Sequence, residues 1–258
     1  QKTGSQAGNL LATTVDFLVW YAHDKNAVKY RQIYLERVPG HVSSDRYDQI
    51  ELPTSKERRL TKAELNRESD IPEGRIFRHT SLISSGQSSY EQELQFFGKK
   101  FDSGAGSHWK TTMDGMVRLQ KAGRVSDGAS TIRYKRFLDD FPVLPISDRW
   151  ESLQIGTGLL YVVQTSAAVI ERCLLMTTDP GDLVLDPTCG SGTTAFVAEK
   201  WGRRWITCDT SRVAITLAKQ RLMTASFDYY ALRYPHEGLG GGFDYETVPH
   251  ITLKSIAN

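Results

Sequence analysis

The stretch at residues 186–194, with the sequence DPTCGSGTT, constrains the fold of this chain more than any other. It follows a short apolar run, residues 183–185, and precedes an alternation of apolar and polar residues that is typical of a helix. A buried strand, a glycine turn and a helix start, in that order, are typical of a site for a nucleotide-type cofactor. A second acid, Asp209, ends the next apolar run, where this architecture places the carboxylate that binds ribose hydroxyls. The sequence therefore predicts an α/β region with a cofactor site at this turn.

The glycine turn has other interpretations, of which a plain tight connection between two elements is the simplest. A phosphate-binding P-loop is disfavoured because no Lys follows Gly192. A cysteine phosphatase loop would need an Arg a few residues after Cys189, where Thr193, Thr194 and Ala195 stand instead. These differences favour a ligand held by its adenosine and a small charged group over a triphosphate.

The segments on either side of the turn, residues 179–187 and 198–206, resemble the cofactor half of bacterial DNA amino-methyltransferases. These enzymes use S-adenosylmethionine to methylate an exocyclic amino group of adenine or cytosine. The resemblance runs from about residue 109 to residue 222, with a weaker echo at 16–25. It is to the permuted branch, which includes type III modification methylases and has its cofactor motif near the C-terminus. It implies an α/β fold: an S-adenosylmethionine-dependent methyltransferase (Rossmann-like) sheet, incomplete here, with an inserted α+β target-recognition domain.

The resemblance also implies which residues bind S-adenosylmethionine. Asp186 would orient the methionine amino group, the amides of residues 190–193 would approach the cofactor, and Asp209 would hold the ribose. In the family a Gln-Lys-Pro element lines the methionine end; here the Gln is kept, but Thr165 and Ser166 replace the Lys and Pro. The expected cofactor-binding set is Gln164, Thr165, Asp186, Pro187, Thr188, Cys189, Gly190, Ser191, Gly192, Thr193, Asp209 and Thr210.

The family's catalytic tetrapeptide, Asp/Asn-Pro-Pro-Tyr/Phe, is absent, because this sequence contains no Pro-Pro pair. In the family its polar atoms accept bonds from the target amino group and its aromatic ring stacks on the flipped base. In the permuted order it would precede residue 1. We therefore assign no catalytic residue and expect the chain to be a fragment that does not methylate by itself.

The charge distribution gives modest support for a nucleic-acid partner, and the composition argues against several classes of site. Residues 1–150 hold 23 Lys and Arg against 19 Asp and Glu, a net charge of +4, whereas residues 151–258 hold 9 against 11, a net charge of −2. A basic excess away from the cofactor motif suits double-stranded DNA, although an ordinary solvated surface would look similar. Three scattered cysteines predict neither a disulfide framework nor a metal site. No signal peptide or membrane-spanning stretch is recognisable, which favours a cytoplasmic protein without a membrane partner. The resemblance allows a homodimer, or a restriction or accessory subunit as partner.

Four regions are expected: residues 1–42 as the N-terminal part of the catalytic sheet, 43–146 as the target-recognition domain, 147–232 as the cofactor-binding Rossmann-like part, and 233–258 as a flexible or extended C-terminal arm. Patterns within them predict individual elements. The expected strands are residues 16–22 (buried), 91–97 and 131–137; the expected helices are 56–68, 109–119 and 167–177; a Ser/Gly-rich loop is expected at 81–89. Thr54 or Ser55 would cap the helix at 56–68.

Basic and aromatic side chains alternate in the second half of the expected recognition domain. Basic groups could neutralise phosphates, and aromatic rings could stack or wedge at a displaced base, although half or more could equally be structural. The residues are Lys110, Arg118, Lys121, Arg124, Arg133, Lys135 and Arg136, with Trp109, Tyr134 and Phe137.

The sequence thus predicts part of a site-specific DNA methyltransferase, with adenine favoured over cytosine because adenine is the commoner target in the family. The alternative is a non-catalytic methylase-like module that binds DNA or a partner protein. A small-molecule or RNA methyltransferase is a third option.

Overall fold

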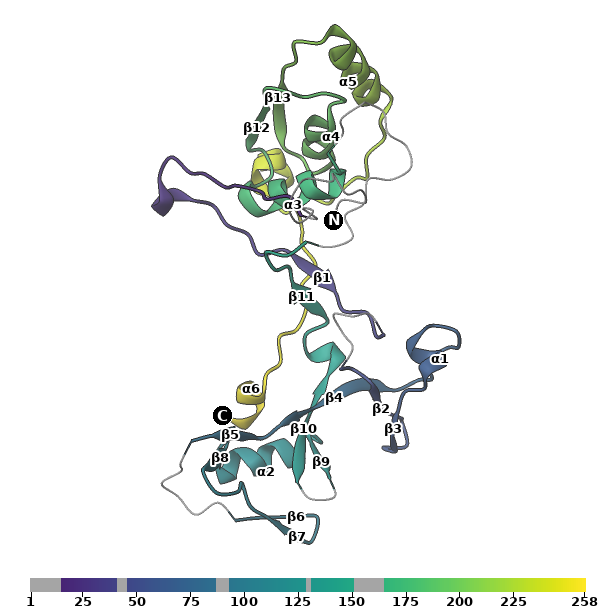
Figure 1. Ribbon diagram of the computed structural model, residues 1–258, viewed down its shortest axis with the longest axis vertical. Coiled ribbons are helices and arrows are strands. Elements are labelled where there is room, and N and C mark those ends of the chain that lie inside the picture. The colour runs from purple at the N-terminus through teal and green to yellow at the C-terminus, as the bar shows by residue number, and fades with distance from the viewer. Residues whose placement is uncertain (1–14, 41–45, 87–92, 129–130, 151–164) are drawn as a thin grey trace, which may run out of the picture. The chain divides into compact units, whose positions relative to one another are not determined.

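The computed structural model describes residues 15–40, 46–86, 93–128, 131–150 and 165–258 (Figure 1). The chain forms two compact units, each built from two segments of sequence. The first unit consists of Gln1–Tyr34 and Pro145–Glu246, and the second of Leu35–Leu144 and Thr247–Asn258. Strands β1 (Tyr34–Glu36) and β11 (Val143–Pro145) pair with each other, and each contains a boundary between the units.

The first unit is an α/β arrangement around two parallel strands, β12 (Leu183–Asp186) and β13 (Arg204–Thr207). Helix α4 (Thr193–Lys200) connects them, as parallel pairing requires a crossover. Helix α3 (Ala167–Thr177) precedes β12 and coincides with the predicted helix at 167–177, which is confirmed. The remaining elements are helix α5 (Arg212–Thr224) and the 3-10 helices η1 (Lys25–Ala27) and η4 (Pro235–Gly241).

The two parallel strands bury one face and expose the other. Val184 and the opposing Trp205 pack against a core that includes Leu174 of α3 and Val197 of α4. Side chains alternate between faces along a strand. Those of the opposite face are exposed in the described structure: Leu183, Leu185 and Ile206.

The predicted buried strand at residues 16–22 is wrong. Its described residues have no regular secondary structure, and Phe17 is 83% exposed. A buried strand needs a neighbour that pairs with its backbone and a face to cover. In the described sheet β12 and β13 pair only with each other, so the apolar run at 16–22 has no strand partner.

The second unit is an α+β arrangement around a five-stranded antiparallel sheet with the strand order β3-β2-β4-β10-β9. These strands are β3 (Glu57–Arg59), β2 (Gln49–Glu51), β4 (Arg75–Ser81), β10 (Ile132–Phe137) and β9 (Val125–Asp127). Two short ladders join β5 (Ile83–Ser85) to β8 (Ser107–Trp109) and β6 (Leu94–Phe96) to β7 (Lys99–Phe101). The helices are α1 (Lys62–Leu65), α2 (Met113–Lys121), α6 (Leu253–Ala257) and the 3-10 helix η3 (Leu138–Asp140).

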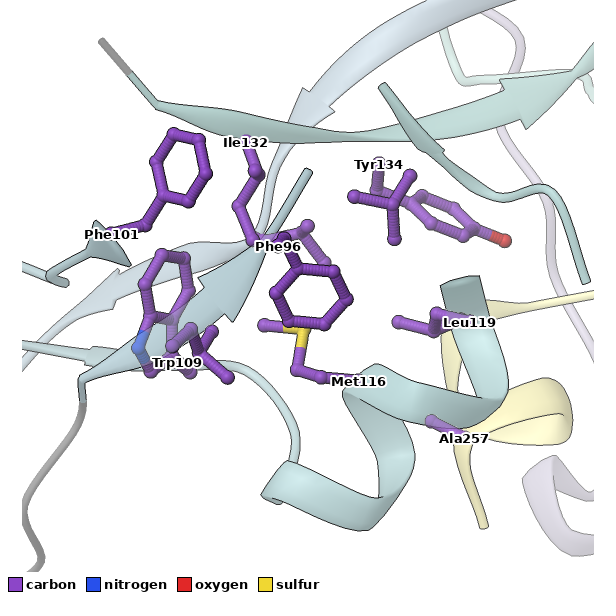
Figure 2. Close-up of a cluster of buried hydrophobic side chains, with 11 residues drawn as sticks. Phe96, Phe101, Trp109, Met116, Leu119, Ile132, Tyr134 and Ala257 are labelled. Carbon is purple, nitrogen blue, oxygen red and sulfur yellow. The ribbon is translucent and has the colours of Figure 1, made fainter. Parts of the chain in front are cut away.

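The core of the second unit forms between α2 and the strands. Figure 2 shows Met116 and Leu119 of α2 directed toward aromatic side chains of the strands, among them Phe96 and Tyr134. Helix α6 joins this core from the C-terminal segment, where Ala257 is 1% exposed. A Cβ placed on Gly115 of α2 would lie 3.2 Å from the Ala257 Cβ, so the two helices approach closely because Gly115 has no side chain.

Several predicted elements of this unit shift or divide. The helix predicted at 56–68 is instead strand β3 followed by the short α1, whose N-cap is Thr61 rather than Thr54 or Ser55. The loop predicted at 81–89 contains β5 in its described part, and residues 87–89 lie outside the described residues.

Other predicted elements of this unit are confirmed in part. The helix at 109–119 is confirmed as α2 but begins at Met113, because Trp109 still belongs to β8. The strands at 91–97 and 131–137 are confirmed as β6 and β10, with residues 91–92 outside the described residues. Among the described residues, no helix is long and apolar enough to cross a membrane.

Candidate cofactor site

The glycine turn begins at Asp186, the last residue of β12, and is fastened to the end of β13. The Asp186 carboxylate accepts a hydrogen bond from the Thr188 N–H at 3.0 Å, and this bond stabilises a turn directly after the strand. The Asp186 carbonyl accepts bonds from the Cys208 N–H at 2.9 Å and the Thr207 hydroxyl at 3.2 Å. The turn therefore lies at the carboxyl ends of both parallel strands, where open α/β sheets bind ligands.

Two glycines give the turn its shape. Gly190 and Gly192 have φ values of 51° and 75°, in the left-handed region that glycine adopts without strain. Gly192 is the N-cap of α4, and its carbonyl accepts a bond from the Phe196 N–H at 2.9 Å. A Cβ on Gly192 would lie 2.8 Å from the Ala218 Cβ of α5. The turn is therefore packed directly against α5, with no room for a side chain at this position.

Asp209 connects the two loops that follow the strands. Its carboxylate accepts bonds from the Ser211 N–H and the Gly190 N–H, both at 2.8 Å. These bonds lower the pKa of Asp209, with the Ser211 bond as the largest cause, so the side chain is ionised at neutral pH. Residues 190 and 209 are far apart in sequence, and the fold joins them in one hydrogen bond. An ionised carboxylate has about four acceptor positions, so Asp209 keeps some for a further donor.

Arg221 of α5 is a residue that the sequence reasoning missed. Its Nη1 lies 3.1 Å from the Thr193 hydroxyl and 3.4 Å from the Ser191 carbonyl, and its guanidinium carbon lies 4.5 Å from the centre of the Phe196 ring. The residue belongs to no motif, so only its position in space reveals its role. Arg221 holds the first turn of α4 against α5.

The structure brings most of the predicted cofactor-binding residues to one edge of the sheet. Pro187, Thr188 and Thr210 are exposed there, whereas Ser191, Gly192 and Thr193 are buried at the start of α4. Cys189 is buried, and its N–H donates to the Cys208 carbonyl at 2.9 Å. Thr165 is exposed, and no hydrogen bond joins it to the turn in the described residues. Gln164 lies outside the described residues.

In the second unit, several of the basic and aromatic side chains considered for nucleic-acid contact are structural, as the sequence analysis allowed for half or more of them. Arg124 is buried and donates to Asp140 at 2.7 Å, while the buried Lys135 lies within 3 Å of both Glu51 and Glu57. Buried charges are stable only when paired, so these two cations are committed to the fold. The three aromatic residues of the expected set lie in the core, where they cannot stack on a base: Trp109, Tyr134 and Phe137.

The remaining basic residues of that set are more accessible. Lys121 and Arg133 are exposed, and Arg136 is half-buried. Lys110 is exposed and donates to the Ser81 carbonyl at 2.9 Å. Arg118 donates to the Ala257 carbonyl at 2.8 Å, which links α2 to α6.

The chain is similar to known proteins along much of its length. The protein-family model N6_N4_Mtase, described as "DNA methylase", matches residues 1–220. Type II methyltransferase M.EcaI of Enterobacter cloacae is 29% identical over 124 residues, covering 45% of this chain and 27% of the relative. DNA adenine methyltransferase YhdJ of Escherichia coli (strain K12) is 35% identical over 88 residues, covering 34% of this chain and 27% of the relative.

One shorter match has higher identity. Type II methyltransferase M2.DpnII of Streptococcus pneumoniae is 44% identical over 54 residues, covering 21% of this chain and 20% of the relative. The crystal structure of an M1.HpyAVI-SAM complex matches with 32% identity and a TM-score of 0.26, covering 28% of this chain and 36% of that chain. The matches cover between 20% and 27% of the length of these three curated relatives.

Proposed function

Because this chain belongs to the DNA methylase family whose model matches residues 1–220, we propose that it is part of an enzyme that transfers a methyl group from S-adenosylmethionine to an exocyclic amino group of a DNA base. The cofactor of this family is S-adenosylmethionine. Double-stranded DNA is the proposed substrate, and the reaction belongs in the bacterial cytoplasm, where chromosomal DNA lies.

One observation carries the proposal: the hydrogen bond between the Gly190 N–H and the Asp209 carboxylate. This bond fixes the glycine turn next to an acid at the end of the second parallel strand, in the arrangement that suits an adenosine ligand. We propose that Asp209 accepts hydrogen bonds from the ribose hydroxyls with its remaining lone pairs. The amides of residues 190–193 would then lie along the cofactor.

The charges at this edge favour S-adenosylmethionine over a nucleoside triphosphate. Two carboxylates lie at this edge: Asp186 ends β12, and Asp209 follows the end of β13. Among the described residues, the basic side chain that hydrogen-bonds to the turn is Arg221, and its bonds go to groups at the start of α4. Carboxylates attract the ammonium and sulfonium groups of the cofactor and repel phosphates. We propose that Asp186 orients the methionine ammonium group.

The remaining residues of the expected cofactor-binding set have a supporting role in this proposal. Pro187, Thr188 and Thr210 would border the ligand, and Cys189, Ser191, Gly192 and Thr193 would shape the turn beneath it. Gln164 and Thr165 are proposed to line the methionine end.

Isothermal titration calorimetry of the 258-residue chain with S-adenosylmethionine tests the site. Asp209→Asn keeps the shape of the side chain but removes its charge. Charge-assisted hydrogen bonds contribute about 1.5–3 kcal/mol, so the affinity should fall by about 10-fold to 100-fold. Asp228→Asn is the control, because Asp228 is an exposed acid in the same unit and has no part in the proposed site. Unchanged affinity in Asp209→Asn, or no binding by the unaltered chain, would contradict the assignment.

In the proposed reaction the target base leaves the duplex and enters a pocket beside the cofactor. S-adenosylmethionine supplies an electrophilic methyl group, which the amino nitrogen attacks in line. The residues of this chain would contribute by position, since holding the reactants in line lowers the barrier without covalent chemistry by the protein. Because the chain has no Pro-Pro pair, we propose that it does not transfer the methyl group by itself.

We propose adenine rather than cytosine as the target, which the similarity to a named DNA adenine methyltransferase supports. A homodimer, or a restriction or accessory subunit, is the proposed assembly. Mass spectrometry of DNA nucleosides after incubation with the complete enzyme would distinguish N6-methyladenine from N4-methylcytosine.

The second candidate function is a non-catalytic module that binds DNA or a partner protein, which the absent tetrapeptide favours. Methyl transfer by a longer protein that contains this chain would exclude it.

A further inference from the structure

Two arginines of the second unit face one buried tyrosine, and a third arginine lies opposite one of them in the sheet. Arg78 of β4 and Arg136 of β10 lie directly opposite each other in the antiparallel sheet, so their side chains share a face. The guanidinium carbons of Arg37 and Arg78 lie 5.5 Å and 5.2 Å from the centre of the Tyr47 ring. Like charges directly opposite each other destabilise a sheet, so this arrangement has a cost that the fold alone does not explain.

Within the described residues, the three positive charges are not neutralised by an acid. In the described part of the chain, no carboxylate forms an ion pair with Arg37, Arg78 or Arg136. Burial lowers the pKa of Arg37, and the positive charges of Arg136 and Arg78 lower it further. The buried Asp140 carboxylate is bound by Arg124 at 2.7 Å and by the Phe137 N–H at 2.9 Å. The cluster therefore keeps a net positive charge.

Two polar groups of the cluster are buried without a hydrogen-bond partner. They are the hydroxyl of Tyr47, a residue that is 1% exposed, and the Nε of Arg78. The ring of Tyr47 lies against the guanidinium groups of Arg37 and Arg78. The Tyr134 hydroxyl and the Asp140 Oδ1 are also buried without a hydrogen-bond partner. This pair differs from Tyr47 and Arg78 because it consists of a donor and an acceptor, and the Asp140 charge acts on Tyr134. Tyr47 and Arg78 each hold a donor without an acceptor, and buried donors of this kind are rare.

We propose that Arg37, Arg78, Arg136 and Tyr47 form a binding site for a phosphate oxyanion. Guanidinium groups match the tetrahedral oxygens of phosphate with paired hydrogen bonds, and the Tyr47 hydroxyl supplies a further donor. This inference rests on the proposed function, which makes a phosphodiester of the DNA backbone the natural source of the group. Inorganic phosphate is a second source of the same chemistry. A backbone contact of this kind positions the duplex without reading its sequence.

The salt dependence of DNA binding tests the phosphodiester. Each phosphate contact contributes about 0.9 to the slope of log affinity against log salt, or about 3.5-fold in affinity between about 50 and 200 mM salt. We expect Arg78→Gln and Arg136→Gln each to lower this slope by about 0.9, measured by fluorescence anisotropy of a labelled duplex with the 258-residue chain. Arg59→Gln is the matched control, because it removes the same charge from an exposed arginine that already pairs with Asp48 at 2.8 Å.

Thermal unfolding in phosphate tests the site without DNA. At equal ionic strength, phosphate in place of chloride should raise the Tm of the unaltered chain and have less effect on Arg78→Gln and Tyr47→Phe. In chloride Arg78→Gln should unfold no earlier than the unaltered chain, because it removes like-charge repulsion. If Arg78→Gln fails to fold, Arg136→Gln decides the salt experiment and Tyr47→Phe decides the phosphate experiment, since Tyr47→Phe keeps the ring in the core.

The outcomes separate this inference from the proposed function. If the chain binds DNA and the Arg78→Gln and Arg136→Gln variants keep the slope of the control, the oxyanion site is wrong while the proposed function stands. If phosphate stabilises the chain through Arg78 but DNA does not bind, the site is supported and the DNA source and proposed substrate are overturned. An equal phosphate effect in all variants overturns the site.

Discussion

Replacing Gly192 with alanine tests whether the glycine turn owes its shape to close packing against α5. Gly192 has φ 75°, and a Cβ there would lie 2.8 Å from the Ala218 Cβ and 3.2 Å from the Ala218 Cα. A left-handed conformation costs an L-residue about 1–2 kcal/mol. Inserting a methyl group into a packed interior costs about 1–3 kcal/mol more. We therefore expect Gly192→Ala to destabilise the first unit by about 2–5 kcal/mol.

Urea unfolding followed by tryptophan fluorescence measures this loss, because Trp201 and Trp205 pack against the core beside α4. Gly181→Ala is the matched control in the same unit. Gly181 has φ 83°, but a Cβ there would meet its nearest atom, the Gly240 Cα, at an ordinary contact distance of 3.4 Å. The control should therefore lose only the conformational part, about 1–2 kcal/mol.

The Ala218→Gly change in the Gly192→Ala background gives a further check, because it removes the methyl group in the closest contact. The double variant should be more stable than the two single losses predict, since contacting residues are energetically coupled. A Gly192→Ala variant that loses no more stability than Gly181→Ala would refute the close-packing argument.

Two further predictions concern ionised groups of the second unit. Asp140→Ala leaves Arg124 buried without its partner and should lower the free energy of unfolding in urea by about 3–5 kcal/mol. The double variant Arg124→Met and Asp140→Leu removes both charges and should lose less; an equal loss would contradict the reasoning. The hydrogen bonds from Arg58 and from the Thr61 backbone lower the pKa of Glu64 from 4.5 to about 2. Its contribution to stability is therefore fully present above about pH 4.5 and lost as the pH falls through about 2. A Glu64→Gln variant should lack that part of the pH dependence, and an NMR titration of Glu64 with an ordinary midpoint would disprove it.

Features set by neighbouring residues were predictable from the sequence. The bounds of the helix at 167–177 could be predicted because they follow from the spacing of apolar residues within the segment itself. The left-handed glycines of the turn were predictable for the same reason, because a tight strand-to-helix turn requires left-handed residues wherever it occurs. The α/β character of the first unit follows from these two signals.

Features set by distant partners were not predictable. The helix in the segment at 56–68 is capped by Thr61 rather than by Thr54 or Ser55, because residues 57–59 form β3, which pairs with β2. Ser55 instead closes a turn through its N–H bond to the Leu52 carbonyl at 2.8 Å. Lys135 looked like a DNA contact because its acid partner Glu51 lies 84 positions away in the sequence. In the candidate site, Arg221 was missed for the same reason.

The position of α6 has a consequence for recombination between related genes. The C-terminal segment Thr247–Asn258 belongs to the second unit, and its helix contacts α2 through Ala257. A recombination event that transplants Leu35–Leu144 alone would leave Leu119 and Met116 without a neighbour that they now pack with. The gene segments for Leu35–Leu144 and Thr247–Asn258 would therefore have to be exchanged together. Otherwise the contact between Gly115 and Ala257 would have to be replaced by changes at Gly115. Shuffling of this unit between related proteins is expected to preserve the two pieces as a linked pair.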